Sequence, residues 1–286
     1  MATFKRSIWE REIRSTLFAK AKVLPLLRND FFKGEEDFSQ TNSTGQNSGG
    51  AFYGGENVYF PKRGSLNVND YQQATGVTIQ DITTTDTPVA IDKHKEITFS
   101  VTDIQRVQAN SELRSGYTED VGEKLRAAIE MDFFTALNND TGIDTVNITH
   151  SDPTYQELLA IQTTLDTGNV PETDRYLVVS PELDAIFRQL KNGSGGTSVY
   201  VEADPESVKT GITGYLAGFQ VIKTNNLPAG VDGFAFHKNA AGLAYNWDVR
   251  VETWRDGKYK RDIVSADARY GIGILEPDFA LKVILV

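Results

Sequence analysis

The residues that could carry out chemistry are few and scattered along the chain. There are three histidines, His94, His150 and His237, and there is no cysteine. The histidines do not show a spacing typical of metal ligands, so each is expected to be a surface or turn residue. The lack of cysteine excludes thiolate nucleophiles, disulfides and zinc–thiolate sites. We therefore expect no cofactor, no metal site and no catalytic residue of these types.

The glycine-containing segments do not match a nucleotide-binding or hydrolase motif either. Gly271 and Gly273 lie in YGIGIL, which lacks the strand–turn–helix context of a dinucleotide site. Ser194 stands between two glycines in a polar loop, without the strand and helix that flank a nucleophile elbow. The 39 acidic residues would permit a glycosidase-type pair, but no pair stands out. The Asn and Asp residues of 138–144 lack EF-hand spacing and indicate a helix end and a turn.

Composition is ordinary for a soluble globular protein, with 40% hydrophobic and 24% charged residues in a chain of 286. No apolar run of about 18 residues is present, so no membrane span is expected. The opening MATFKRSIWERE is interrupted by charge, which does not fit a secretory signal. A net charge of −10 disfavours a protein that attracts nucleic acid over its whole surface.

The first 100 residues read as extensions around a small number of core residues. Residues 4–28 have helical spacing up to Pro25, and their narrow apolar stripe indicates that this helix lies on another element as an arm. Its basic residues favour a solvated amphipathic helix; docking on an acidic neighbour or facing DNA are the alternatives. Residues 39–57 are polar and Gly-rich. Residues 50–85 read as a long hairpin-like loop, and a compact enzyme rarely has such an extension.

The middle of the chain predicts a long helix. After a short helix at 103–110, apolar or aromatic residues recur every fourth position from Leu113 to Leu137, which predicts a helix over about 111–138. Each four-residue step rotates the stripe by roughly 40°, so the stripe winds around the helix. A helix of about 42 Å with this pattern is expected to meet different elements along its length.

From residue 151 the pattern alternates between helix and strand. Asp152 is expected to cap a helix that starts with Pro153 and ends at Gly168, and Ser180 to cap the next one. The predicted strands include the buried RYLVVS and an apolar C-terminal segment that must pair into a sheet. These strands lie at 175–180, 218–224, 233–237, 243–254, 262–277 and 279–286. The fold class is therefore α+β.

Four segments in sequence order resemble the Hong Kong 97-type capsid fold of tailed-phage major capsid proteins. TDIQRVQAN (102–110) resembles the start of that family's spine helix, and LDTGNVPETDRYLVVSPEL (165–183) its axial-domain helix–loop–strand–helix. YLAGFQVIKTNNLP (215–228) resembles the element that follows. Residues 243–280, with a tyrosine–glycine step, resemble the closing strands of the peripheral domain. The resemblance covers roughly residue 100 to the end.

The resemblance implies a division of the chain and a mechanical function. It assigns residues 1–45 to an N-terminal arm, 46–85 to the extended loop, 86–149 and 240–286 to the peripheral domain with the spine helix at 111–138, and 150–239 to the axial domain. Many copies would form hexamers and pentamers of an icosahedral shell around double-stranded DNA, without sequence-specific binding. The implied partners are a separate scaffolding protein, a portal and a decoration protein, with assembly in the host cytoplasm and a final place in the virion.

The inter-subunit contacts are expected in the loop and the arm. The loop segment 50–72 is dense in aromatic residues and short of aliphatic partners, so its aromatic side chains are expected on a neighbouring subunit. The loop candidates are Phe52, Tyr53, Tyr59, Phe60, Lys62, Arg63 and Tyr71, and the arm candidates are Trp9, Arg11 and Arg14. Lys62, placed near the loop tip, could join an isopeptide bond as in one branch of the fold; we favour a solvated lysine.

Three alternatives follow from the same sequence. An encapsulin-like nanocompartment shell shares the fold and differs in what it encloses. A secreted carbohydrate-active enzyme would need a signal peptide and a carboxylate-lined cleft. A phage tail or adhesin component would form fibres or tubes instead of closed shells.

Overall fold

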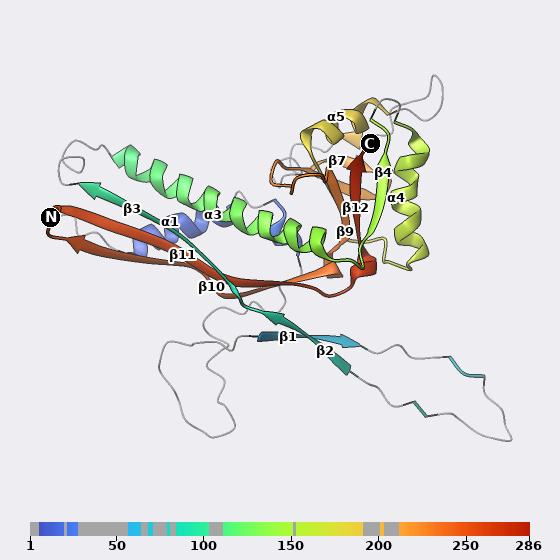
Figure 1. The fold of residues 1–286 in the computed structure, drawn as a ribbon, viewed down its shortest axis with the longest axis horizontal. Coiled ribbons are helices and arrows are strands. Elements are labelled where there is room, and N and C mark those ends of the chain that lie inside the picture. Colours follow the sequence, from blue (N-terminus) through green and yellow to red (C-terminus); the bar gives the residue numbers. More distant parts are fainter. Residues whose placement is uncertain are drawn as a thin grey trace.

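A long helix, α3 (Ser111–Asn139), runs through the molecule beside two different sheets (Figure 1). The computed structural model describes residues 6–19, 22–27, 57–63, 68–70, 79–80, 84–102, 111–150, 153–190, 201–202 and 212–286. The predicted helix at 111–138 is thus confirmed to within one residue. The short helix predicted at 103–110 lies outside the described residues.

The winding stripe of α3 is confirmed by the change of partners along the helix. In its N-terminal half, Tyr117 stacks on Phe99 of the first sheet with 5.7 Å between ring centroids. In its C-terminal half, Phe133 lies edge-on to Phe236, and the Phe134 ring stacks on a ring of the second sheet. One helix therefore contributes to the cores of both sheets.

The first sheet is antiparallel and lies under α3. Within the described residues it has three strands in the order β10 (Ala241–Asp256), β11 (Arg261–Ile274), β3 (Lys93–Thr102). Burial alternates along β3, so that successive side chains lie on opposite faces of the sheet. Val251, Val264 and Ala266 are fully buried on the face that packs against the helices. The other face carries polar side chains, including Thr98 and Ser265, which are joined by a hydrogen bond.

The N-terminal helix α1 (Arg6–Ala19) lies on α3 and β10 of its own chain. Ile13 and Leu17 are fully buried there, which confirms that the narrow stripe lies on another element. The helix is shorter than the predicted 4–28. Pro25 lies inside a short 3₁₀ helix, η1 (Leu24–Leu26), since proline fits the first turn of such a helix and not the interior of an α-helix.

The second sheet is mixed and larger. Its seven described strands have the order β4 (Asp144–Ile148), β12 (Ala280–Leu285), β9 (Gly233–His237), β5 (Arg175–Val179), β8 (Phe219–Lys223), β7 (Ile212–Leu216), β6 (Val201–Glu202). All five residues of β5 are buried, as predicted. Leu177 and Val179 share a core with α4 (Tyr155–Thr167) and α5 (Pro181–Gln189), whereas Tyr176 and Val178 share one with α3.

Capping residues set the ends of α4 and α5, and one of the predicted caps is corrected. Ser180 caps α5 by accepting a hydrogen bond from the Leu183 backbone N–H, as predicted. The cap of α4 is Thr154 instead of Asp152, because Thr154 and Glu157 form a reciprocal capping box. The backbone hydrogen bond from Thr154 holds the pKa of Glu157 below its usual value. Gly168 ends α4, as predicted.

Two further strands, β1 (Asn57–Arg63) and β2 (Thr84–Ala90), pair antiparallel from Asn57↔Ala90 to Arg63↔Thr84. They project from the sheet of β10 and β11 (Figure 1), so the hairpin-like base of the predicted loop is confirmed.

The strand pairing divides the chain differently from two of the predicted domain boundaries. β4 and β12, which the prediction places in the peripheral domain, are adjacent strands of the seven-stranded sheet. The physical reason is burial, because β12 places Leu281 and Val283 in the core beneath α4 and α5.

Candidate assembly surfaces

β1 and β2 form the root of the extended loop, and this root lies on a floor of small residues in β10 and β11. Phe60 of β1 and Val89 of β2 are buried with Ala244 of β10 and Leu275, which follows β11. A Cβ atom added at Gly242 would lie 2.8 Å from the Phe60 ring, and one added at Gly273 would collide with Val89. Glycine at these positions lets the loop strands approach β10 and β11 closely.

Phe60 requires a correction to the sequence-based interpretation. It is 1% exposed, and its partners belong to its own chain. The argument that this loop segment finds no aliphatic partners in the subunit is therefore wrong for Phe60. The signal that could have found this contact is the small-residue pattern of 242–244 and 271–273, which leaves space above the sheet. Phe60 anchors the loop to its own subunit.

Lys62 also lies elsewhere than expected. It pairs with Thr85 in the register of β1 and β2, so it belongs to the root and not to the tip of the loop. Its Nζ donates to Glu276 Oε2 at 2.6 Å, which ties the loop to the turn after β11. Lys62 is thus ion-paired, and the expectation of a purely solvated lysine is corrected.

The remaining loop candidates lie on the surface or outside the described residues. The Tyr59 side chain is 57% exposed on β1. Arg63 ends β1, and nothing is described of its side chain. Phe52, Tyr53 and Tyr71 lie outside the described residues. Tyr59 is therefore the exposed aromatic candidate at the loop root.

The arm candidates lie on α1. Arg11 and Arg14 are exposed on the side of the helix away from the core, while the Trp9 side chain is not described. The opposite side fits closely against α3, since a Cβ atom added at Gly122 would come within 3.0 Å of the Ile13 carbonyl oxygen. Over this stretch, the helix binds its own chain and presents its arginines outward.

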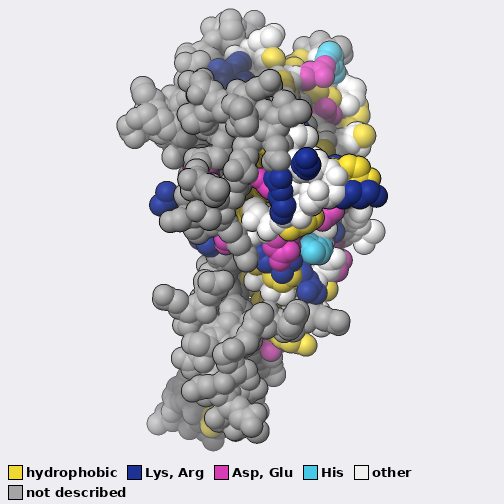
Figure 2. All heavy atoms as spheres, turned by 90° about the vertical axis from the view of Figure 1, so that its left-hand side faces the viewer, with side chains coloured by type: hydrophobic (Ala, Val, Ile, Leu, Met, Phe, Trp, Pro, Cys, Tyr) yellow, Lys and Arg dark blue, Asp and Glu magenta, His cyan; other side chains and the backbone are white. Residues whose placement is uncertain are grey.

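The hairpin between β10 and β11 carries a surface that the sequence interpretation missed. Trp254 is 47% exposed and Tyr259 60% exposed. The Arg261 guanidinium lies 4.8 Å from the Tyr259 ring centroid, and Asp256 accepts from Arg261 Nε at 3.1 Å. Figure 2, viewed from this end, shows basic side chains close to acidic ones. The available signal was the aromatic and charged run WRDGKYKR around a turn.

The three histidines have structural roles. His94 contacts Asp267, and the exposed His150 pairs with Glu182 at 2.9 Å. His237 is buried, contrary to a surface position, and its Nδ1 accepts from the Asn239 backbone N–H to cap η2 (Lys238–Ala240). Burial lowers the pKa of His237 and so favours its neutral form.

A partly buried hydrogen bond joins α3 to β11. The Tyr270 hydroxyl donates to Asp132 Oδ2 at 2.7 Å. Burial and this carboxylate together raise the pKa of Tyr270, so the phenol stays protonated as the donor.

In the part of the chain that the structure describes, no group of three or more His, Asp or Glu residues is arranged to hold a metal ion. No described helix is long and apolar enough to span a bilayer.

An extended two-stranded loop, a long helix over a three-stranded sheet and a compact mixed sheet together define a capsid shell subunit of the Hong Kong 97-type fold. Solved shells share this arrangement. The chain aligns with a Mycobacterium phage Che8 protein at 24% identity and a TM-score of 0.63, covering 93% of this chain and 91% of that one. A Cyanophage P-SCSP1u capsid structure matches at 17% identity and 0.61, covering 91% and 97%. A virus-like particle from Pyrococcus furiosus matches at 14% and 0.61, covering 100% of both chains.

The chain belongs to the phage capsid protein family, whose sequence model matches residues 69–283. The comparison with curated proteins found no match. The protein is thus a major capsid protein of a bacteriophage, a structural and non-enzymatic component of the virion. This confirms the sequence-based assignment of fold and class.

Proposed function

We propose that the subunits assemble as hexamers and pentamers into an icosahedral shell that encloses double-stranded DNA. The observation that carries this proposal is that β1 and β2 project from the body of a phage capsid subunit while being anchored to it at their root. A projecting segment with a fixed root can reach a neighbouring copy and hold it at a defined angle.

The proposed contacts between copies combine the loop, the arm and the edge of the first sheet. In the loop, Tyr59, Arg63 and the aromatic residues Phe52, Tyr53 and Tyr71 contact the neighbour, with Phe60 and Lys62 fixing the root. In the arm, the proposed contacts are Trp9 and the exposed Arg11 and Arg14. The hairpin tip adds Trp254 and Tyr259, because exposed aromatic side chains favour protein contacts.

The charge of the chain supports enclosure of DNA without tight binding. A net charge of −10 gives no general attraction for phosphates, whereas a strongly basic wall would hold DNA in a salt-dependent manner. We further propose a scaffolding protein, a portal and a decoration protein as partners, with assembly in the host cytoplasm before incorporation into the virion.

The test is electron microscopy of the purified protein, alone and co-expressed with its scaffolding protein. We expect closed particles, or capsomers when the scaffold is missing. A monomer under all these conditions would contradict the proposal.

A nanocompartment shell is the second candidate, favoured by the full-length match to the Pyrococcus furiosus virus-like particle. Nuclease-protected DNA inside particles from infected cells supports the phage shell. Particles from those cells that hold protein cargo and no protected DNA would favour the nanocompartment.

A further inference from the structure

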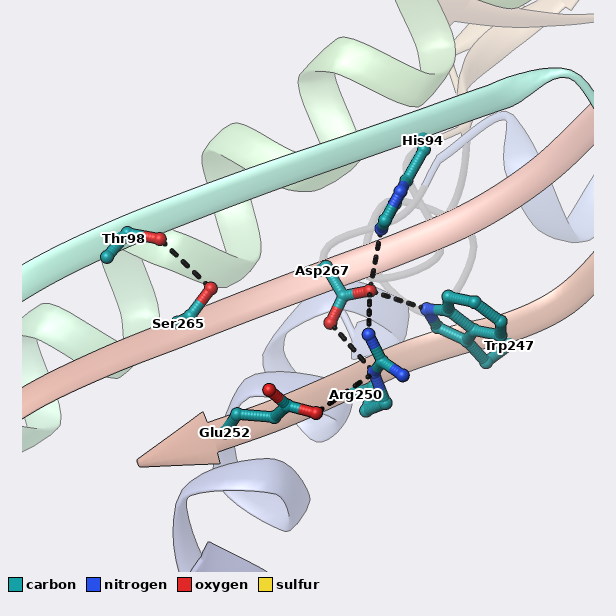
Figure 3. Close-up of polar contacts among 7 residues, drawn as sticks. All are labelled: His94, Thr98, Trp247, Arg250, Glu252, Ser265 and Asp267. Carbon is teal, nitrogen blue, oxygen red and sulfur yellow. Dashed lines mark hydrogen bonds and ion pairs between the residues drawn. The ribbon is translucent and has the colours of Figure 1, made fainter. Parts of the chain in front are cut away.

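Asp267 is a buried carboxylate on the solvent side of the three-stranded sheet. Its neighbours in β11, Ala266 and Ala268, are fully buried in the core, so Asp267 points to the opposite face because side chains alternate along a strand. Its side chain is nevertheless only 7% exposed. Figure 3 shows His94 of β3 and Trp247 and Arg250 of β10 gathered around it.

The contacts of Asp267 join all three described strands of this sheet. Trp247 Nε1 donates to Oδ2 at 2.9 Å, and Arg250 donates from Nε to Oδ1 and from Nη2 to Oδ2, both at 3.2 Å. His94 Nε2 lies 2.8 Å from Oδ2. The Arg250 guanidinium also lies 4.6 Å from the Trp247 ring centroid. We call Asp267, His94, Trp247 and Arg250 the Asp267 cluster.

The Asp267 cluster coincides with two irregularities in β10. Between Tyr245 and Trp247 the strand advances by two residues while β11 advances by one, and between Trp247 and Arg250 it advances by three against two. In a regular strand, two residues three positions apart face opposite sides. The second bulge brings Trp247 and Arg250 to the same face, where both reach Asp267.

Bulges bend a strand and increase its twist, so their position affects the direction of the strand beyond them. Six residue steps separate Arg250 from the end of β10 at Asp256, a lever of about 20 Å. A change of about 10° in strand direction, roughly half the usual angle between neighbouring strands, would move the hairpin tip by about 3.5 Å. That tip carries the exposed Trp254 and Tyr259.

We propose that the Asp267 cluster positions the β10–β11 hairpin for assembly by fixing the bulges of β10, and that it thereby sets the curvature of the shell. This inference rests on the proposed function of the protein as a closed shell. Its members are positioning residues: they act on the neighbouring subunit through the direction of the hairpin and need not touch it.

The experiment compares Asp267→Asn and Trp247→Phe with wild type in electron microscopy of particles assembled under one condition. We expect Asp267→Asn to shift or broaden the particle diameter, with protein lost to tubes and open sheets, and Trp247→Phe to cause a smaller change. Hydrogen exchange of unassembled subunits should rise over residues 245–256 in both variants. Circular dichroism should stay close to wild type.

Ser265→Ala is the matched control, because Ser265 lies on the same strand and face and accepts a hydrogen bond from Thr98 at 2.9 Å, outside the Asp267 cluster. It should leave the diameter unchanged. Wild-type diameters from a folded Asp267→Asn variant would overturn the inference. If Asp267→Asn does not fold, wild-type diameters from Trp247→Phe would overturn it. Absence of shells from the wild type would instead contradict the proposed function, whatever the variants do.

Discussion

The two main sheets of this subunit differ in how completely they bury themselves. Strands of the seven-stranded sheet have helices on both faces, α4 and α5 on one and α3 on the other. The three-stranded sheet buries one face under α1 and α3, has β1 and β2 over part of the other face, and extends into an exposed hairpin tip. The three-stranded sheet is therefore better suited to contacts in assembly, because its uncovered surface and hairpin tip remain available to other copies.

This difference separates two sources of stability. The seven-stranded sheet depends on apolar packing, which needs no neighbour. The three-stranded sheet depends also on close backbone approach at its glycines and on the contacts of one buried carboxylate. Variants that remove only one of these sources should therefore lower the stability of the subunit by different amounts.

The largest expected loss comes from the shared apolar core. Phe133 is fully buried and packs on Phe134 and Phe236. Phe133→Ala should lower the free energy of unfolding by about 3–5 kcal/mol, and Leu125→Ala by about 2–5 kcal/mol, measured by urea titration. Met131→Ala, two residues away and partly exposed, should change it by less than about 0.5 kcal/mol. Wild-type midpoints for Phe133→Ala would show that α3 does not join the two sheets.

The next effect tests the floor beneath the loop root. A Cβ atom at Gly271 would collide with the Ala90 carbonyl oxygen, which belongs to the backbone and cannot rotate away. Gly271→Ala should cost about 1–3 kcal/mol and increase proteolysis of the loop. Gly257→Ala, at a position with open space, should have little effect. Equal stability of the two variants would mean that the loop root is not held against the sheet.

A smaller effect is expected at the capping box of α4. Thr154→Ala removes the acceptor for the Glu157 backbone N–H and should cost about 1 kcal/mol in thermal or urea unfolding. Thr163→Ala changes an exposed threonine of the same helix that has no capping contact, and serves as the control. If both variants unfold alike, the cap does not stabilise this domain.

The smallest effect concerns pH. Burial depresses the pKa of His237, while an unfolded histidine titrates near 6.5. Below about pH 6.5 the unfolded state therefore binds more protons, and stability should fall as the pH drops. His237→Asn keeps a side-chain acceptor for the turn and should show a flatter profile of urea midpoints between pH 7.5 and pH 5.5 than wild type. Parallel profiles for His237→Asn and wild type would contradict this role.

Local patterns were sufficient to predict α3 and the strands β5, β8, β9 and β12 of the seven-stranded sheet, whereas β4, β6 and β7 were not predicted. The apolar run of 175–179 predicts a buried strand, and Ser180 followed by Pro181 predicts a helix start, because both signals act within a few residues. The same holds for the four-residue spacing of α3.

The candidate sites depended on pairings between distant residues. Lys62 was placed near a tip because the register of β1 with β2 is set across about 20 residues of intervening sequence. Phe60 appeared to lack partners because its floor lies some 180 residues further along the chain. From an alternating strand pattern, Asp267 is expected to be a solvent-facing charge. Its partners come together through the bulges of β10, which this pattern does not show.

The central claim is that the loop beyond its root serves contacts between copies, while each subunit folds without it. The most direct test replaces residues 64–83 with a short Gly-Ser turn and keeps β1, β2 and the Phe60 anchor. Circular dichroism and electron microscopy are then compared with wild type under conditions that yield shells. We predict near-normal circular dichroism and no closed shells. Normal shells from this variant, or loss of folding, would contradict the claim.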